Sequence, residues 1–139
     1  MEFINPEEFK NQPKEIQKVF MEWWQPQQFD LYLFDKHFLQ IVKKYNEDLI
    51  LPYKGNNVWE EKIHCIPLFT EGQLRKFIED KTRKILFIDF EMIDDKLSYS
   101  IYLFQDNDRY ENYDNLGDDL LQAYWKAALE IVKESTENE

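Results

Sequence analysis

The chain has 139 residues, with 17 Lys or Arg against 28 Asp or Glu, so its formal net charge is −11. Hydrophobic residues make up 43% and aromatic residues 17%, which is too apolar for intrinsic disorder, and three Gly and five Pro exclude a collagen-like or linker composition. No apolar run approaches the roughly 18 residues of a membrane span, and the acidic start MEFINPEEF lacks the core of a signal peptide. We therefore expect one compact domain over 1–139.

The excess negative charge lies in the second half of the sequence. From 85 to 139 there are 4 basic and 14 acidic residues, a net of 4 − 14 = −10, whereas 1–84 has 13 − 14 = −1. Such an asymmetric field repels nucleic acid and anionic membranes and attracts basic partners. The plainer interpretation is an acidic surface that only keeps the protein in solution.

The first half predicts short helices followed by strands. Asn5-Pro6 starts a helix that ends before Pro13, and Pro13 starts a second helix that ends at Trp24, so helices occupy 1–24. Asp35-Lys36 would form a tight turn between two strands. No regular element is predicted over 43–61, where Gly55-Asn56-Asn57 marks a loop. The expected strands of the segment 30–66 are 30–34, 37–42 and 63–66, the last closed by Pro67.

The second half, 70–134, predicts a helix, a hairpin and a second helix. Thr70 and Gln73 have the spacing of a capping box, which starts a helix ending near Thr82. Apolar residues alternate over 86–92 and 97–103 on either side of Asp94-Asp95, which predicts an antiparallel hairpin with one wet face. A polar loop over 105–115 and a helix over 116–134 complete the pattern. The predicted fold class is α+β, a single-domain two-layer sandwich with helices on one face of a small antiparallel sheet.

Asp89 and Glu91 are the best candidates for catalytic residues. They alternate along one strand and project from the same face, where two carboxylates could hold Mg²⁺ or Mn²⁺. The apolar strand followed by Asp-x-Glu resembles the first motif of the DEDD exonuclease family. Only 48 residues follow Glu91, too few for the strands and helices that carry the remaining ligands of that family. We expect Asp89 and Glu91 to lie on a solvated sheet face, and we predict no metal site.

The other residue types offer little chemistry. His37 is expected in a surface turn, and His64 and Cys65 are adjacent on a strand, so they point to opposite faces and cannot form a nucleophile–base pair. A single cysteine can form neither an internal disulfide nor a cysteine zinc site, which fits a reducing cytoplasm. The three glycines, among them Gly72, are too widely separated for a phosphate-binding loop. We predict no cofactor and no catalytic residue.

Aromatic residues are the second feature of this sequence that suggests a function. Trp23 and Trp24 differ by 100° around a helix, so both are not expected to be fully buried. Exposed Trp and Tyr side chains are favoured anchors of protein interfaces. The alternative is that Trp24 and Trp125 flank the core and pack there. We expect a partner-binding site that contains Tyr102, Tyr110, Tyr113, Asp114, Trp24 and Trp125.

Several segments resemble small uncharacterised proteins of bacteriophages and prophages of Gram-positive bacteria. The resemblance lies in IPLFTEGQLRKFIED (66–80) and LLQAYWKAA (120–128), and in PEEF (6–9) and PKEIQKV (13–19) followed by Trp23-Trp24. The helix–hairpin–helix order of the second half is also similar to phage ABA-sandwich domains. The resemblance implies an accessory protein that acts in the cytoplasm of the bacterial host, and it supplies no catalytic residues.

Three hypotheses of function follow. The first is a non-enzymatic accessory protein of a phage or prophage that binds a host or phage protein with a basic surface, as an acidic inhibitor of a host defence or nucleic-acid-handling protein. Neither direct nucleic-acid binding nor membrane binding is expected. The second is a small metal-dependent hydrolase or nuclease that uses Asp89 and Glu91. The third is a structural homo-oligomer whose exposed aromatic residues meet across a symmetric interface.

Overall fold

A computed structural model describes residues 2–27, 30–34, 38–41, 43–45, 48–51, 56–57, 65–105 and 110–137 of the chain. By their internal contacts the residues divide into two compact units. The N-terminal unit is Asn5–Phe69, and the C-terminal unit is Thr70–Glu139 together with Met1–Ile4. The fold is α+β, and the prediction of small antiparallel sheets combined with helices is confirmed.

The two predicted N-terminal helices are confirmed as α1 (Pro6–Lys10) and α2 (Lys14–Trp23). The side chain of Asn5 accepts a hydrogen bond of 2.9 Å from the Glu7 amide at the start of α1, because the first amides of a helix have no partner within it. Both helices bury aromatic rings. The ring centroids of Phe9, Phe20 and Phe69 lie 5.6–6.3 Å apart and form the core of the N-terminal unit.

The N-terminal unit contains two three-stranded antiparallel sheets. The first has the order β2-β1-β6, and its strands are those expected from the sequence, although the Asp35-Lys36 turn lies outside the described residues. The second has the order β3-β4-β5 and lies in 43–61, where no element was predicted; Asn56–Asn57, expected in a loop, forms a strand. The strands are β1 (Leu31–Phe34), β2 (Phe38–Ile41), β3 (Lys43–Tyr45), β4 (Asp48–Leu51), β5 (Asn56–Asn57) and β6 (Cys65–Pro67).

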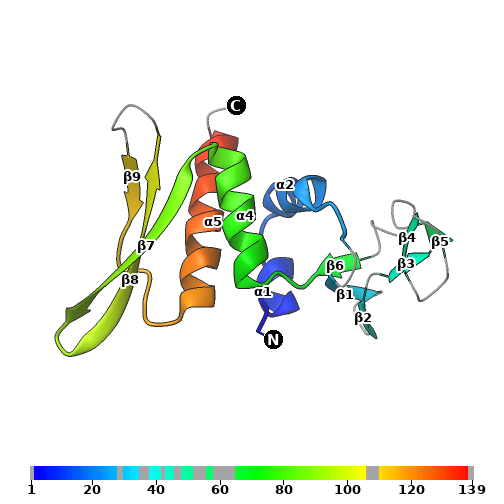
Figure 1. Cartoon of the computed structure of the whole chain (residues 1–139), viewed down its shortest axis with the longest axis horizontal. Coiled ribbons are helices and arrows are strands. Elements are labelled where there is room, and N and C mark those ends of the chain that lie inside the picture. The colour runs from blue at the N-terminus through cyan, green and yellow to red at the C-terminus, as the bar shows by residue number, and fades with distance from the viewer. Residues whose placement is uncertain are drawn as a thin grey trace. The chain divides into compact units, whose positions relative to one another are not determined.

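The C-terminal unit is a two-layer arrangement of two helices on one sheet. In Figure 1, α4 and α5 lie side by side next to the sheet of order β7-β8-β9. Leu86 of β7 and Ile101 and Leu103 of β8 are fully buried against the helical layer. The elements are α4 (Glu71–Thr82), β7 (Ile85–Ile93), β8 (Lys96–Phe104), β9 (Tyr110–Tyr113) and α5 (Leu120–Glu137).

Caps determine where both helices of this unit begin. The predicted capping box is confirmed: Thr70 Oγ1 accepts from the Gln73 amide, and Gln73 Oε1 accepts from the Thr70 amide at 2.9 Å. The start of α5 was predicted four residues too early. Asp119 Oδ1 accepts from the Gln122 amide at 3.0 Å, which places the cap at Asp119 and the first helical residue at Leu120.

The predicted hairpin is confirmed over its full length. β7 and β8 pair from Ile85↔Phe104 to Ile93↔Lys96, and Asp94 and Asp95 form a two-residue turn between them. Both turn residues have positive φ, 50° and 63°, as a type I′ turn requires. The expected polar loop over 105–115 is partly wrong, because Tyr110–Tyr113 forms β9, which pairs with Ile101–Phe104 of β8.

The hairpin is longer than the helical layer that covers it. Alternation predicts that Leu86, Ile88, Phe90 and Met92 share the buried face of β7. Leu86 is buried, but Phe90 and Met92 are each 62% exposed, so the prediction is wrong for the far half of the strand. In Figure 1 the tip of the hairpin lies away from α4 and α5, which explains why apolar residues there remain in contact with solvent.

The capping box allows a first test of the fold. Replacing Thr70 with Ala removes the acceptor of the Gln73 amide, and we expect the free energy of unfolding to fall by about 1 kcal/mol. The control is Lys76→Ala, which removes a surface ion pair with Asp80 (3.0 Å) on the same helix and should cost less than about 0.5 kcal/mol. Urea unfolding followed by circular dichroism measures both. Equal losses in the two variants would contradict a structural role for the cap.

Candidate functional site

Among the described residues of the C-terminal unit, no helix covers one of the two faces of its sheet. Side chains of β7 and β8 alternate between the two faces, so Ile85, Phe87, Asp89 and Glu91 lie opposite to the buried Leu86, and Phe104 lies opposite to the buried Leu103. Ile85 is 59% exposed and Phe87 is 52% exposed. We call this surface the helix-free face; it consists of Ile85, Phe87, Asp89, Glu91, Tyr102 and Phe104.

Two aromatic rings pack against each other in the apolar part of the helix-free face. The ring centroids of Phe87 and Phe104 are 5.1 Å apart, and the rings are nearly perpendicular at 88°. Phe87 lies opposite Tyr102 and Phe104 lies opposite Ile85, so the two rings are diagonal neighbours across the strands. A shallow concavity is present among these side chains and is also lined by Arg83 and Gln105. The arrangement offers apolar contact area at the surface with charged groups beside it.

Carboxylates lie beside the apolar residues along the hairpin. Asp89 and Glu91 are exposed, as predicted, and so are Asp94 and Asp95 at the tip. Asp89 Oδ1 accepts a hydrogen bond of 2.8 Å from the amide of Phe90. Within the described ranges, no three His, Cys, Asp or Glu side chains are grouped so that they could hold a metal ion. Because these carboxylates are exposed, they can contact cationic groups in solvent.

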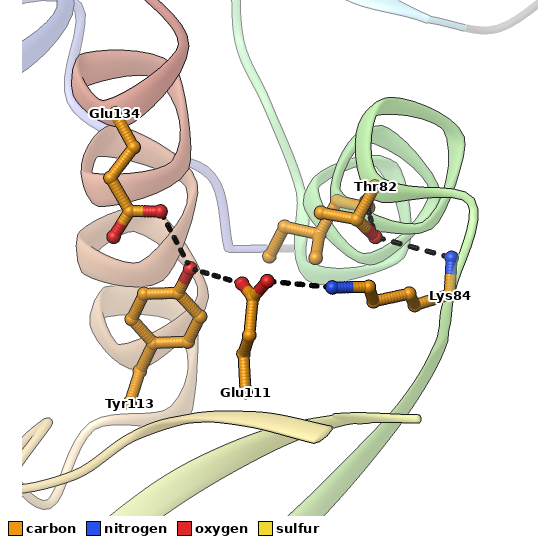
Figure 2. Close-up of polar contacts among 6 residues, drawn as sticks. Thr82, Lys84, Glu111, Tyr113 and Glu134 are labelled. Carbon is orange, nitrogen blue, oxygen red and sulfur yellow. Dashed lines mark hydrogen bonds and ion pairs between the residues drawn. The ribbon is translucent and has the colours of Figure 1, made fainter. Parts of the chain in front are cut away.

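A second polar cluster lies between the sheet and the helices. Figure 2 shows the Tyr113 hydroxyl between Glu111 of β9 and Glu134 of α5, at 3.3 Å from each carboxylate. Lys84 Nζ forms an ion pair of 2.6 Å with the other oxygen of Glu111, and the Lys84 side chain is only 15% exposed. Thr82 Oγ1 accepts from the Lys84 amide at 3.3 Å. These contacts fasten β9 to α5 and to the start of β7.

The Tyr113 hydroxyl is held in its neutral form. Partial burial raises the pKa of Tyr113 well above its usual range, and the negative charges of Glu134 and Glu111 raise it further. Since a phenol has one proton to donate, two carboxylates compete for it. The cluster is thus a structural contact in which the Tyr113 hydroxyl keeps its proton at neutral pH.

The structure separates the residues of the predicted partner-binding site. By register, Tyr102 lies on the helix-free face, whereas Tyr113 pairs with Ile101 and points toward α5. Tyr110 pairs with Phe104 in β9, and its side chain lies outside the described part. Asp114 is exposed and accepts a hydrogen bond of 3.0 Å from Asn112. Among the members of this set whose side chains the structure describes, Tyr102 lies on the helix-free face.

The two tryptophans of the predicted site are buried, which corrects their assignment to a contact surface. Trp24 is 1% exposed and Trp125 is 3% exposed, so the alternative that places them in the core describes them better. The indole N–H of Trp24 donates to Asp30 Oδ2 at 3.3 Å, and burial raises the pKa of that carboxyl group. Trp23 is partly exposed, which agrees with the prediction that Trp23 and Trp24 are not fully buried at the same time.

Sequence reasoning missed the apolar residues of the helix-free face. The signal was present, because Phe87 alternates with Leu86 and shares a face with Asp89 and Glu91. Ile85 and Phe104 share that face by register. Of the residues considered for catalysis, Cys65 is buried, and His37 and His64 lie outside the described residues.

Comparison of the chain with models of protein families, with curated proteins and with solved structures finds no match. In the portion of the chain that the structure describes, no helix has the length and apolar character needed to cross a membrane.

Tyr113 makes stability depend on pH in the alkaline range. Because the folded chain raises the pKa of Tyr113 above its ordinary value of 10.0, the stability that depends on its proton is complete below pH 10 and falls as the pH rises further. Replacing Tyr113 with Phe should lower the free energy of unfolding by about 0.5–1.5 kcal/mol at neutral pH. The loss should shrink above pH 10 in urea titrations. Parallel pH profiles of the two proteins would contradict this assignment.

The Lys84–Glu111 ion pair gives a further prediction. Lys84→Met retains the apolar stem but leaves Glu111 without its cation, so we expect a loss of about 1 kcal/mol in the free energy of unfolding. A double-mutant cycle with Glu111→Gln separates the pair from each residue's other contacts. A coupling energy near zero would show that the short contact does not stabilise β9.

Proposed function

We propose that this protein is a binding protein without catalytic activity and that it contacts a partner protein through the helix-free face. The observation that carries the proposal is the exposure of Ile85, Phe87 and Phe104 together on an ordered sheet surface. Burying exposed apolar surface is the main driving force of protein association, and aromatic anchors dominate it. Clusters of exposed apolar side chains on a folded protein are typical of interaction sites.

The charge of the same surface specifies the partner. Asp89 and Glu91 flank the aromatic pair, and the segment 85–139 has a net charge of 4 − 14 = −10. A partner with an apolar patch bordered by Lys or Arg would be attracted over a distance of about 10 Å at 0.1 M salt, whereas acidic partners would be repelled. The partner is therefore a protein with a basic surface, such as the nucleic-acid-binding region of a host protein.

The biological setting belongs to the same proposal. The resemblance of 66–80 and 120–128 to phage and prophage proteins supports an accessory role in the cytoplasm of a Gram-positive host, with inhibition of a defence or nucleic-acid-handling protein as the outcome. If the carboxylates only imitate phosphates, binding should weaken steeply with salt. If the aromatic pair supplies most of the affinity, binding should persist at high salt.

The test is capture followed by quantitative binding. Tagged wild-type protein is incubated with a Gram-positive bacterial lysate, and each captured protein is purified and titrated against wild type and two variants. We expect Phe87→Ser with Phe104→Ser to weaken binding by about tenfold or more, because truncated anchors typically cost at least 1–2 kcal/mol. Lys76→Ser, on the exposed side of α4, is the control and should bind like wild type.

Two outcomes would contradict the proposal. Equal affinities of the wild type and the double variant for the purified partner would place the contact elsewhere. A stable dimer in sedimentation at micromolar concentration that the double variant abolishes would instead support the homo-oligomer hypothesis.

A further inference from the structure

The outer edge of β7 carries backbone groups that β8 does not use. In an antiparallel pair every second residue directs its N–H and C=O toward the partner strand, and the residues between direct theirs outward. The Ile93↔Lys96 pair next to the two-residue turn bonds to β8, so Ile93 and its alternate residues face β8. Leu86, Ile88, Phe90 and Met92 therefore direct their backbone groups outward.

Helix α4 occupies only the first position on this edge. The Leu86 amide donates to Glu79 Oε2 at 3.2 Å, and Arg75 Nη2 donates to the Leu86 carbonyl at 2.9 Å. Arg75 and Glu79 also contact each other, at 3.5 Å between Nε and Oε1. The two side chains thus bond the edge groups of Leu86 as a neighbouring strand would, and any added strand must begin beyond Leu86.

The remaining edge lacks such a cover over the described residues. The Phe90 amide donates a hydrogen bond to the carboxylate of the preceding residue, Asp89. This bond confirms that the Phe90 amide points away from β8. β7 has β8 as its one neighbouring strand in the described sheet. A long, apolar and uncovered edge strand is a surface on which another chain can form a ladder.

We propose that β7 accepts an extended segment of the partner as an additional antiparallel strand along Ile88–Met92, and that this segment alternates apolar with Lys or Arg residues. The inference rests on the proposed function and specifies how the partner binds. Cross-strand neighbours share a face. Apolar residues of the segment would lie opposite Ile88, Phe90 and Met92, and its cations would lie opposite Asp89 and Glu91.

The charges on β7 disfavour a second copy of this chain as an antiparallel partner centred within Asp89–Glu91. A two-fold axis at Phe90 would place Asp89 opposite Glu91 of the other copy. An axis at Asp89 or at Glu91 would place that carboxylate opposite its own counterpart. Like charges directly opposite on a sheet are destabilising, and β7 has no cation to offset them. A basic segment turns the same positions into ion pairs.

Antiparallel addition makes a prediction about individual backbone amides of the segment. Its apolar residues, opposite the outward-facing residues of β7, would donate and accept the ladder hydrogen bonds. Its basic residues would direct their amides away from β7. Methylation of the backbone nitrogen at apolar positions should therefore prevent binding, whereas methylation at basic positions should not.

The probe is a capped synthetic peptide of alternating Val and Lys that matches the length of Ile88–Met92, titrated into the full-length protein by NMR. We expect saturable shifts on β7, and a loss of affinity of about tenfold or more when the Val nitrogens are methylated, from the removal of at least two hydrogen bonds. The peptide methylated at Lys should bind like the parent. Equal binding of both methylated peptides would overturn the inference, because the peptide would then contact a face of the sheet and not its edge.

Charge is tested with matched variants. Asp89→Asn with Glu91→Gln should weaken the parent peptide about tenfold at low salt, whereas Asp118→Asn with Glu137→Gln changes the net charge equally at exposed positions away from β7 and should have little effect. Equal weakening in both double variants would overturn the assignment of the cations to Asp89 and Glu91.

If the peptide fails to bind while Phe87→Ser with Phe104→Ser still abolishes binding of the captured partner, the inference fails and the proposed function remains.

Discussion

The antiparallel ladder between β7 and β8 is the interaction on which the C-terminal unit depends. It pairs Ile85–Ile93 with Lys96–Phe104 without interruption, because Asp94 and Asp95 adopt the positive φ values of the connecting turn. β9 pairs on its far side, and α4 and α5 pack on one face through Leu86, Ile101 and Leu103. The ladder continues beyond this packing, so the hairpin keeps its backbone pairing where its side chains are no longer covered. The exposure of Phe90 and Met92 results from this excess length, whereas Phe87 and Phe104 are exposed because they lie on the helix-free face.

Local signals in the sequence were sufficient for the elements whose formation is local. Three kinds of signal act within a few residues, and the structure contains all of them: the caps at Asn5 and Thr70, the prolines at the starts of α1 and α2, and the alternation on either side of Asp94-Asp95. β9 was missed, because Tyr110–Tyr113 has polar and aromatic residues in a segment too short to establish a period of two. Its position depends on pairing with β8 and on the contacts of Tyr113 with Glu134 and of Glu111 with Lys84, which no local pattern encodes.

The exposed far half of β7 was less predictable, because it depends on where coverage by α4 and α5 ends. The sequence indicates that Phe90 and Met92 share a face with Leu86. No pattern in it indicates the residue at which the helices stop covering that face. The same limitation applies to the tryptophans. Trp24 and Trp125 are amphipathic side chains that suit a surface anchor as well as a core, and only the packing around them places both inside. The exposed carboxylates of Asp89 and Glu91 were predicted correctly, because strand alternation alone determines their face.

The most direct test of this account is amide hydrogen exchange in β7 of the unliganded protein. We expect β8 to protect the Phe87, Asp89 and Glu91 amides and Glu79 to protect the Leu86 amide, whereas the Ile88 and Met92 amides should exchange fast. Protection of Ile88 and Met92 equal to that of their neighbours would mean that the outer edge is already occupied, and it would contradict the account.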